Sequence, residues 1–183
     1  IFDQLAPVHG LPPGQRVSLE MGALLHDVGR AVNARAHHKH GEYLVLHADI
    51  PGLGKHQQAM VACLVRYHGK ATPEAHHRQY RSLAPAERRR VRQLAALLQI
   101  AVALDSGDTQ TVRRIEVKIQ KKDVRLRIFA PPDAYVDFRA LRRKARLLEK
   151  ECSVRVRFDR GRWIERPTRA EQTALRTTAR SAS

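Results

Sequence analysis

The hydrophobic residues in the first part of the chain recur with the spacing of an α-helix. Leu19, Ala23 and His26 follow one another at intervals of four and three residues, which places them on one face of a helix that begins near Gln15. A polar stretch over residues 69–83 predicts a long loop or a broken helix. The same helical periodicity predicts further elements over residues 1–9, 38–47, 55–67 and from residue 85 to about residue 105.

After Gly107 the pattern changes to alternation of apolar and charged residues. Alternation over residues 115–119 and 124–128 predicts two strands, joined by a turn at residues 121–123. A helix over 135–151 and a strand over 154–158 would complete a β-β-α-β unit. We therefore expect a mainly α protein of the α+β class. It would consist of a helical bundle over residues 1–107, a small α/β appendage over 108–158 and a basic, largely disordered tail over 159–183.

Three ionisable residues lie on faces that are otherwise apolar. His26 continues the stripe of its helix, His68 extends the stripe of residues 55–67, and Asp105 lies eleven residues beyond Leu94 on the long helix. An unpaired buried charge is expensive, so a carboxylate on such a face needs a partner. A divalent metal would serve, because imidazole and carboxylate ligands together suit Mn, Fe, Zn or Mg. The candidate ligands are His26, Asp27, His40, His68 and Asp105.

Not every histidine is expected to bind a metal. For His40 and His68 the alternative to metal binding is a hydrogen-bonded histidine in the core. Six further histidines are predicted to lie on the surface or in loops: His37, His38, His47, His56, His76 and His77.

The charge of the chain is strongly positive. It carries 34 Lys and Arg residues against 18 Asp and Glu, a formal net charge of +16. Such a surface attracts polyanions, and nucleic acid, polyphosphate and nucleotide phosphates are all candidates. Lys39, Arg66 and Lys70 lie near the histidines in sequence and would be phosphate contacts. The alternative for these three residues is a solvated basic surface.

The apolar runs, the two cysteines and the first residue bear on where the protein acts. No run of about 18 apolar residues is present to cross a bilayer, so we expect a protein that does not act in the membrane. Cys63 and Cys152 lie far apart and form no CxxC pair, so both are expected to be reduced in a cytoplasmic protein. The chain begins at Ile1, which favours a cut through a longer protein.

Two segments of the chain resemble the HD superfamily of metal-dependent phosphohydrolases. Residues 23–29 (ALLHDVG) resemble the second helix of that superfamily, and residues 98–105 (LQIAVALD) resemble the helix that supplies its last aspartate. The full HD pattern has another histidine on a preceding helix, for which His9 is a poor substitute.

Four further segments resemble the C-terminal part of the Ppx/GppA family of exopolyphosphatases and guanosine pentaphosphate phosphatases. The resemblance extends from residue 1 to about residue 158 and implies an HD-like bundle. The segments are FDQL at 2–5, HHKHGEYL at 37–44, DIPGLG at 49–54 and VRYHGK at 65–70.

The family resemblance implies that the hydrolytic centre lies elsewhere. In that family it occupies two amino-terminal domains of the actin and sugar-kinase type, and no glycine-rich phosphate loop follows a strand here. The C-terminal part is taken to form a cationic channel or platform for the polyanion and to support dimerisation. We therefore expect a domain without catalytic residues of its own. Its partners would be polyphosphate or guanosine pentaphosphate (pppGpp), the upstream catalytic domains and a second copy of the chain.

Two alternatives remain open. One is an HD-type phosphohydrolase active in its own right, in which a metal lowers the pKa of the attacking water. The other is an RNA-binding module on the basic strands, which carry Lys118, Lys121, Lys122, Arg125 and Arg127. Sequence-selective RNA modules commonly stack bases on exposed aromatic residues, and these strands offer only Phe129, so RNA ranks third.

Overall fold

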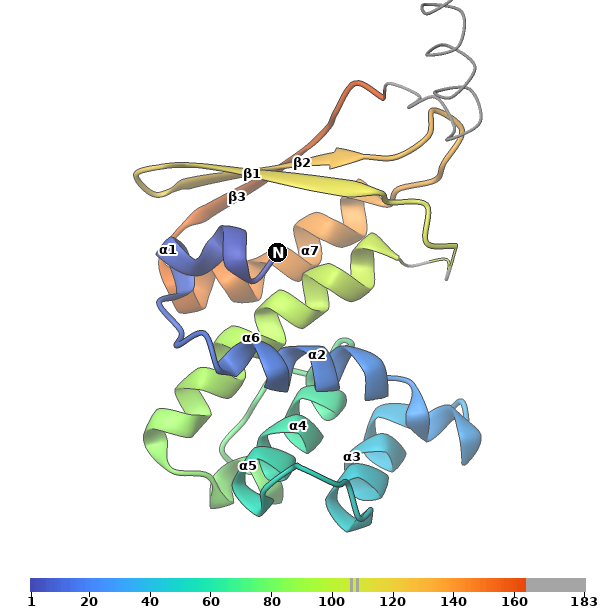
Figure 1. Cartoon of the computed structure of the whole chain (residues 1–183), viewed down its shortest axis with the longest axis vertical. Helices are drawn as coiled ribbons and strands as arrows, with labels where there is room; N and C mark the ends of the chain where they lie inside the picture. The colour runs from blue at the N-terminus through green and yellow to red at the C-terminus, as the bar shows by residue number, and fades with distance from the viewer. Residues whose placement is uncertain (106, 108, 164–183) are drawn as a thin grey trace, which may run out of the picture.

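The computed structural model describes residues 1–105, 107 and 109–163. Helices make up most of this part of the chain, and a three-stranded sheet lies at one end (Figure 1). In chain order the elements are η1 (Asp3–Leu5), α1 (Ala6–His9), α2 (Gln15–Leu25), η2 (Val28–Ala31), α3 (His37–His47), α4 (Lys55–Tyr67), α5 (Arg78–Ser82), α6 (Pro85–Leu104), β1 (Arg114–Gln120), β2 (Asp123–Phe129), α7 (Phe138–Cys152) and β3 (Arg155–Arg160). The mainly α, α+β class predicted from the sequence is confirmed.

The sheet has the strand order β1-β2-β3. β1 and β2 form an antiparallel hairpin, whereas β2 and β3 are parallel and are connected through α7. Because alternate residues of a strand point to opposite faces, Val124, Leu126 and Ile128 turn toward the helices and are buried. Figure 1 shows α7 and α6 beneath this face, with α2 to α5 farther from the sheet.

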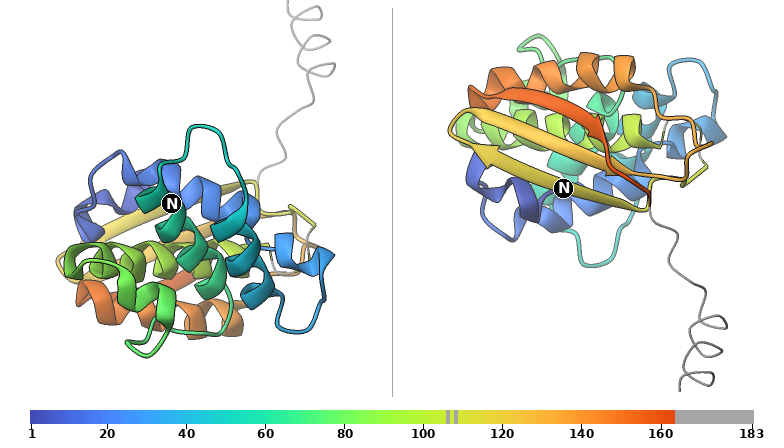
Figure 2. Two further views of the ribbon diagram at one scale, coloured as in Figure 1. Left: turned by 90° about the horizontal axis from the view of Figure 1, so that it is seen from below. Right: turned by 90° about the horizontal axis from the view of Figure 1, so that it is seen from above.

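The opposite face of the sheet is not covered by any helix in the part of the chain that the structure describes, and the right-hand view of Figure 2 shows it in front of the helices. Pairing across the strands sets Lys118 beside Arg125 and Arg125 beside Arg157, so these three exposed cations form one row. The outer face of the sheet is therefore a basic surface.

One hydrophobic core joins the sheet to the helices. Leu64 of α4, Leu97 of α6, Leu126 of β2 and Leu141 of α7 are fully buried and belong to the same cluster of packed residues. Burying a leucine side chain contributes about 2 kcal/mol to folding, so this shared core is a large part of what stabilises both regions. The predicted division at residue 107 into bundle and appendage stays a prediction.

Side-chain contacts fix where the two longest helices begin. Pro85 occupies the first turn of α6, and the Glu87 carboxylate accepts a hydrogen bond of 2.9 Å from the backbone N–H of Ala84. At α7 the Asp137 carboxylate accepts a hydrogen bond of 2.8 Å from the N–H of Ala140. These caps satisfy backbone donors that the helices leave free at their N-termini.

The N-terminal segment contacts the free edge of β1. The side-chain amide of Gln4 donates to the carbonyl of Ile115 at 3.0 Å and accepts from the N–H of Val117 at 2.8 Å. One side chain thus takes the place that a neighbouring strand would occupy along two residues of β1.

Gly29 lies buried inside η2, four residues after Leu25, the last residue of α2. The stretch 69–83, predicted to be a long loop or a broken helix, contains the short helix α5. Most of the predicted tail, residues 164–183, lies outside the described residues. No described helix is both long enough and apolar enough to cross a membrane.

Candidate functional site

A cleft of about 540 Å³ opens where several helices end or begin. Its walls come from the ends of α2, α4 and α6, the turn around η2, and the start of α3, and α7 adds Lys144. Leu98, Ala101 and Val102 of α6 supply apolar lining, and Lys70 and Lys144 supply positive charge. Its size is in the range of small-molecule sites.

Three histidines at the cleft share one arrangement of their ring nitrogens. In each, Nδ1 lies against a backbone carbonyl oxygen three residues earlier in the chain. The pairs are His26 with Ala23 at 2.7 Å, His37 with Ala34 at 3.1 Å and His68 with Val65 at 2.6 Å. A carbonyl oxygen only accepts hydrogen bonds, so Nδ1 is the donor in all three rings and Nε2 carries the lone pair of a neutral ring.

The three Nε2 atoms converge on the carboxylate of Asp27. His37 and His68 approach its Oδ1 at 3.4 and 4.0 Å. His26 approaches its Oδ2 at 3.6 Å. The Nε2 atoms of His37 and His68 are 3.1 Å apart. Asp27, His37 and His68 therefore place three donor atoms within the reach of one metal ion.

The members of this cluster differ in exposure. His68 is buried, with 4% of its surface exposed. Burial lowers the pKa of His68 to about 4, although its hydrogen bond to the Val65 carbonyl opposes the shift. His68 is therefore neutral at pH 7, the form in which imidazole binds metals. Asp27 is half-buried and also receives Arg30 Nε at 2.9 Å.

Glycine makes this convergence sterically feasible. A Cβ atom on Gly29 would overlap the backbone carbonyl of His37 and the N–H of Gly41. A Cβ atom on Gly41 would overlap the side chain of Val65 in α4. Gly29 therefore lets η2 lie directly against α3, which brings Asp27 close to His37, and Gly41 lets α3 lie against α4.

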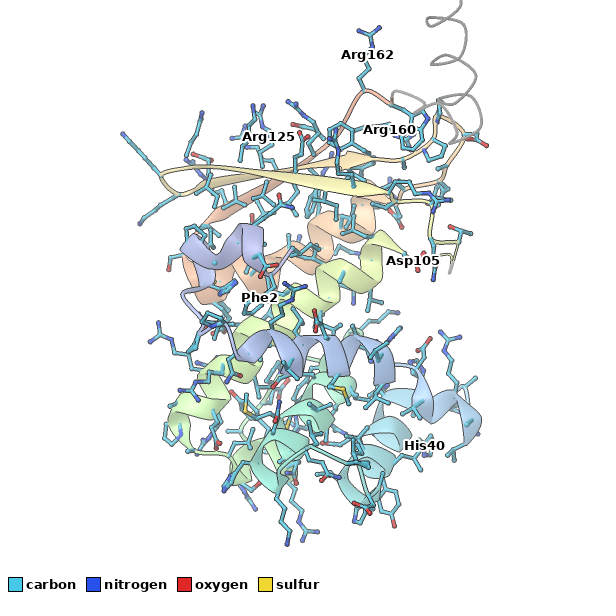
Figure 3. All side chains as sticks on the ribbon, in the orientation of Figure 1. Phe2, His40, Asp105, Arg125, Arg160 and Arg162 are labelled. Carbon is cyan, nitrogen blue, oxygen red and sulfur yellow. The ribbon has the colours of Figure 1, made fainter. Side chains whose placement is uncertain are left out.

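Asp105 lies at the cleft but in a different role. It follows the last residue of α6 and lines the cleft together with His26 and Asp27. Its Oδ1 accepts a hydrogen bond of 2.7 Å from the N–H of Gln110. Figure 3 shows Asp105 near the sheet end of the helices. It is not one of the three donors that come within metal-binding reach of one another.

His40 lies away from the cluster. It is one helical turn beyond His37 on α3, does not line the cleft, and is seen apart from Asp105 in Figure 3. The predicted phosphate contacts are also divided. Lys70 lines the cleft, whereas Lys39 and Arg66 line a second hollow of about 690 Å³, where Arg66 Nη1 pairs with Glu42 Oε2 at 2.6 Å.

Lys144 connects α7 to the cleft. Its Nζ donates to the backbone carbonyl of Gly69, just after α4. Burial lowers the pKa of Lys144, and the nearby charges of Lys70 and Arg143 lower it further. The cleft thus has contributions from both the helical bundle and the β-β-α-β segment.

The sequence reasoning missed His37. That histidine was predicted to lie on the surface or in a loop, but it is half-buried at the first residue of α3 and faces Asp27 and His68. The sequence does show that His37 lies one helical turn before His40, on the same face of the helix. This periodicity alone cannot decide whether His37 or His40 faces the cleft, because that depends on the path of the chain from η2 into α3.

The chain matches the family model of the Ppx/GppA phosphatase, domain III, over residues 1–151. The chain belongs to the Ppx/GppA phosphatase family. At the level of the family, this is a group of hydrolases of the exopolyphosphatase type. Every residue that lines the cleft falls inside the range that matches the Ppx/GppA domain, whereas β3 follows it.

Proposed function

We propose that this chain is the C-terminal polyanion-binding and oligomerisation domain of a Ppx/GppA-type phosphatase. The main catalytic centre, which removes terminal phosphates from polyphosphate or pppGpp, would lie upstream in the same cytoplasmic protein. The family match over residues 1–151 carries this proposal, and the net charge of +16 supports the polyanionic ligand.

The outer face of the sheet is the surface that best suits such a ligand. Lys118, Arg125 and Arg157 lie side by side on three adjacent strands, which are spaced about 4.8 Å apart. Among the described residues, Lys118 and Arg157 take part in no ion pair, whereas Arg125 Nε lies 3.3 Å from Asp159 Oδ2. Figure 3 shows Arg125 and Arg162 on the side of the sheet away from the helices.

The same face offers little to nucleobases. Phe129 is buried, and the guanidinium of Arg114 lies 4.1 Å from the centre of its ring. Base stacking requires exposed aromatic surface, and Phe129 does not provide it. A ligand recognised through its phosphates alone, such as polyphosphate, is therefore favoured over RNA.

A salt series tests polyanion binding. Polyphosphate is titrated into the 183-residue chain at several salt concentrations, and log K is plotted against log salt. We expect a steep negative slope that loses about 2 units when Lys118, Arg125 and Arg157 are all replaced by Gln, since each phosphate contact contributes about 0.7. Binding that does not change with salt would contradict the proposal.

A matched variant separates the sheet from the rest of the basic surface. Arg139, Arg142 and Arg146 are exposed on α7, and replacing them with Gln removes the same charge. An equal loss of slope in both triple variants would show that the polyanion is attracted by net charge in general.

Parallel titrations with pppGpp compare the two ligands, and sedimentation at increasing protein concentration tests for the homodimer.

A second candidate function is an HD-type metal-dependent phosphohydrolase in the cleft. The observation in its favour is that Asp27, His37 and His68 lie in one cleft with Lys70 and Lys144. A bound divalent ion would supply Lewis-acid polarisation of a phosphoryl oxygen. Lys70 and Lys144 would hold the phosphate as point charges. Release of phosphate from nucleotides with added Mn²⁺, abolished by Asp27→Asn, tests this function.

A further inference from the structure

We propose that His37 and His68, through their Nε2 atoms, and Asp27, through its carboxylate, form a binding site for one divalent transition-metal ion. The set differs from the one predicted from the sequence, because it contains His37 and lacks His40 and Asp105. It is independent of polyanion binding on the sheet, whereas the second candidate function depends on it.

The approach of His37 to His68 is the first reason. Both Nδ1 atoms donate to backbone carbonyls, so both Nε2 atoms of the neutral rings are acceptors. Two acceptor atoms 3.1 Å apart repel each other unless a cation lies between or beside them. A metal ion bound by both nitrogens would supply that charge.

The distances are those of a metal site. Nitrogens that each bind one ion at about 2.05 Å are about 3.3 Å apart in tetrahedral geometry and about 2.9 Å apart at a right angle. The observed 3.1 Å between His37 and His68 lies between these values. The 3.4 Å between His37 Nε2 and Asp27 Oδ1 is close to the tetrahedral value. The 4.0 Å between His68 Nε2 and the same oxygen is longer than the tetrahedral value but within the reach of one ion.

The surroundings hold the ligands in place. Histidines that bind metals almost always donate their other ring N–H to a carbonyl or carboxylate, which fixes the tautomer and the ring orientation. Ala34 and Val65 provide such carbonyls here for His37 and His68. Two imidazoles and one carboxylate favour Zn²⁺, Fe²⁺ or Mn²⁺ over Mg²⁺ and Ca²⁺, which prefer oxygen ligands.

The experiment uses the 183-residue chain after removal of metal with a chelator. Zn²⁺ is added up to a few equivalents in the presence of excess Mg²⁺, and stoichiometry is measured by elemental analysis after desalting. We expect one Zn²⁺ per chain and a higher melting temperature for the loaded protein, because a ligand of the folded state stabilises it. Co²⁺ in the same site should give a visible absorption spectrum that differs from that of the aqueous ion.

Neighbouring histidines and two aspartates at the cleft give matched pairs of variants. His37→Gln should weaken Zn²⁺ binding at least about tenfold, whereas His40→Gln, one turn away on α3, should leave it within about twofold. Asp27→Asn should likewise weaken binding far more than Asp105→Asn. Equal effects within each pair would overturn the proposed ligand set.

Further measurements keep the test decisive. If His37→Gln does not fold, as judged by circular dichroism without metal, Asp27→Asn should still weaken binding. Failure of the unmodified chain to retain Zn²⁺ would overturn the site whatever the variants do. Polyphosphate binding by the metal-free chain is measured separately, so loss of one proposal is distinguishable from loss of the other.

Discussion

His9 and His68 are both buried, but their ring nitrogens have different partners. In His9, Nδ1 accepts from the N–H of Leu11 at 2.9 Å and Nε2 donates to the carbonyl of Phe2 at 3.0 Å. The backbone therefore satisfies both nitrogens of His9. In His68 the backbone satisfies one nitrogen, and the other faces Asp27 and His37. His9 thus stabilises the N-terminal turn, while His68 has a nitrogen available for a ligand.

His9 should make stability depend on pH. Burial lowers its pKa below the ordinary value of 6.5, so near that value the unfolded chain binds more protons than the folded one. The contribution is fully present above about pH 6.5 and decreases as the pH falls toward the folded pKa. Urea unfolding at pH 7.5 and 5.5 should show a smaller loss of stability at low pH in His9→Gln than in the unmodified chain.

The same substitution has a second expected effect. At pH 7.5, His9→Gln should lower the free energy of unfolding by about 1–3 kcal/mol, because at least one buried backbone group loses its partner. An unchanged pH dependence in the variant would mean that other groups account for the acid sensitivity of the fold.

The sequence identified some residues of the cleft and not others. His26, His68 and Asp105 were found because an ionisable residue on an apolar stripe stands out against a simple periodic pattern. Asp27 was found because it directly follows His26 in the segment that resembles the HD superfamily. His37 could not be found in this way, because it starts its helix and its direction depends on the path through η2. Lys144 lies more than seventy residues away from Lys70, and only the packing of α7 brings it to the same cleft.

Close contact between η2 and α3 is the packing feature that assembles the cluster. Gly29→Ala would place a methyl group against the His37 carbonyl, which η2 can avoid only by moving away from α3. We expect a loss of several kcal/mol in the free energy of unfolding, or failure to fold, together with loss of metal binding. Chemical unfolding and Zn²⁺ titration measure the two effects.

Gly54 provides the control for that substitution. It lies just before α4, and a Cβ atom there would meet nothing within 4 Å. Gly54→Ala should therefore change stability by less than about 1 kcal/mol and leave metal binding intact. Equal stability of the two variants would show that η2 and α3 adapt more easily than the contact suggests.

Most helices and strands could be predicted because each buries one face with a regular period. α4 and α6 have long apolar stripes, and apolar and charged residues alternate along most of β1 and β2, so their positions follow from the sequence. The bounds of α5 could not be predicted, since the four polar residues around Tyr80 have no clear period and the helix depends on Tyr80 packing into the core. Short elements of this kind are decided by tertiary contacts.

At the scale of the molecule, the shared core predicts that bundle and sheet unfold together. Leu126→Ala in β2 should lower the free energy of unfolding by about 3 kcal/mol and shift the transition of the whole chain. Circular dichroism follows the helices, and fluorescence of the single tryptophan, Trp163, follows the end of the sheet. Leu24→Ala, at a site that is 79% exposed, serves as the control.

The two signals should change at the same denaturant concentration in both the unmodified chain and Leu126→Ala. Two separate transitions, with only the fluorescence shifted in Leu126→Ala, would instead favour independent domains divided near residue 107. The measurement therefore tests the domain division predicted from the sequence.

The contact of Gln4 with β1 affects how readily the sheet could associate with other molecules through its edge. An unpaired strand edge is a template on which strands of other molecules can add and build fibrils. The Gln4 amide already occupies the backbone carbonyl of Ile115 and the N–H of Val117, and on the opposite edge of the sheet β3 carries Arg155, Arg157 and Arg160. Addition of a strand from another molecule is therefore disfavoured where Gln4 binds β1, and the positive charge of β3 disfavours it at the other edge.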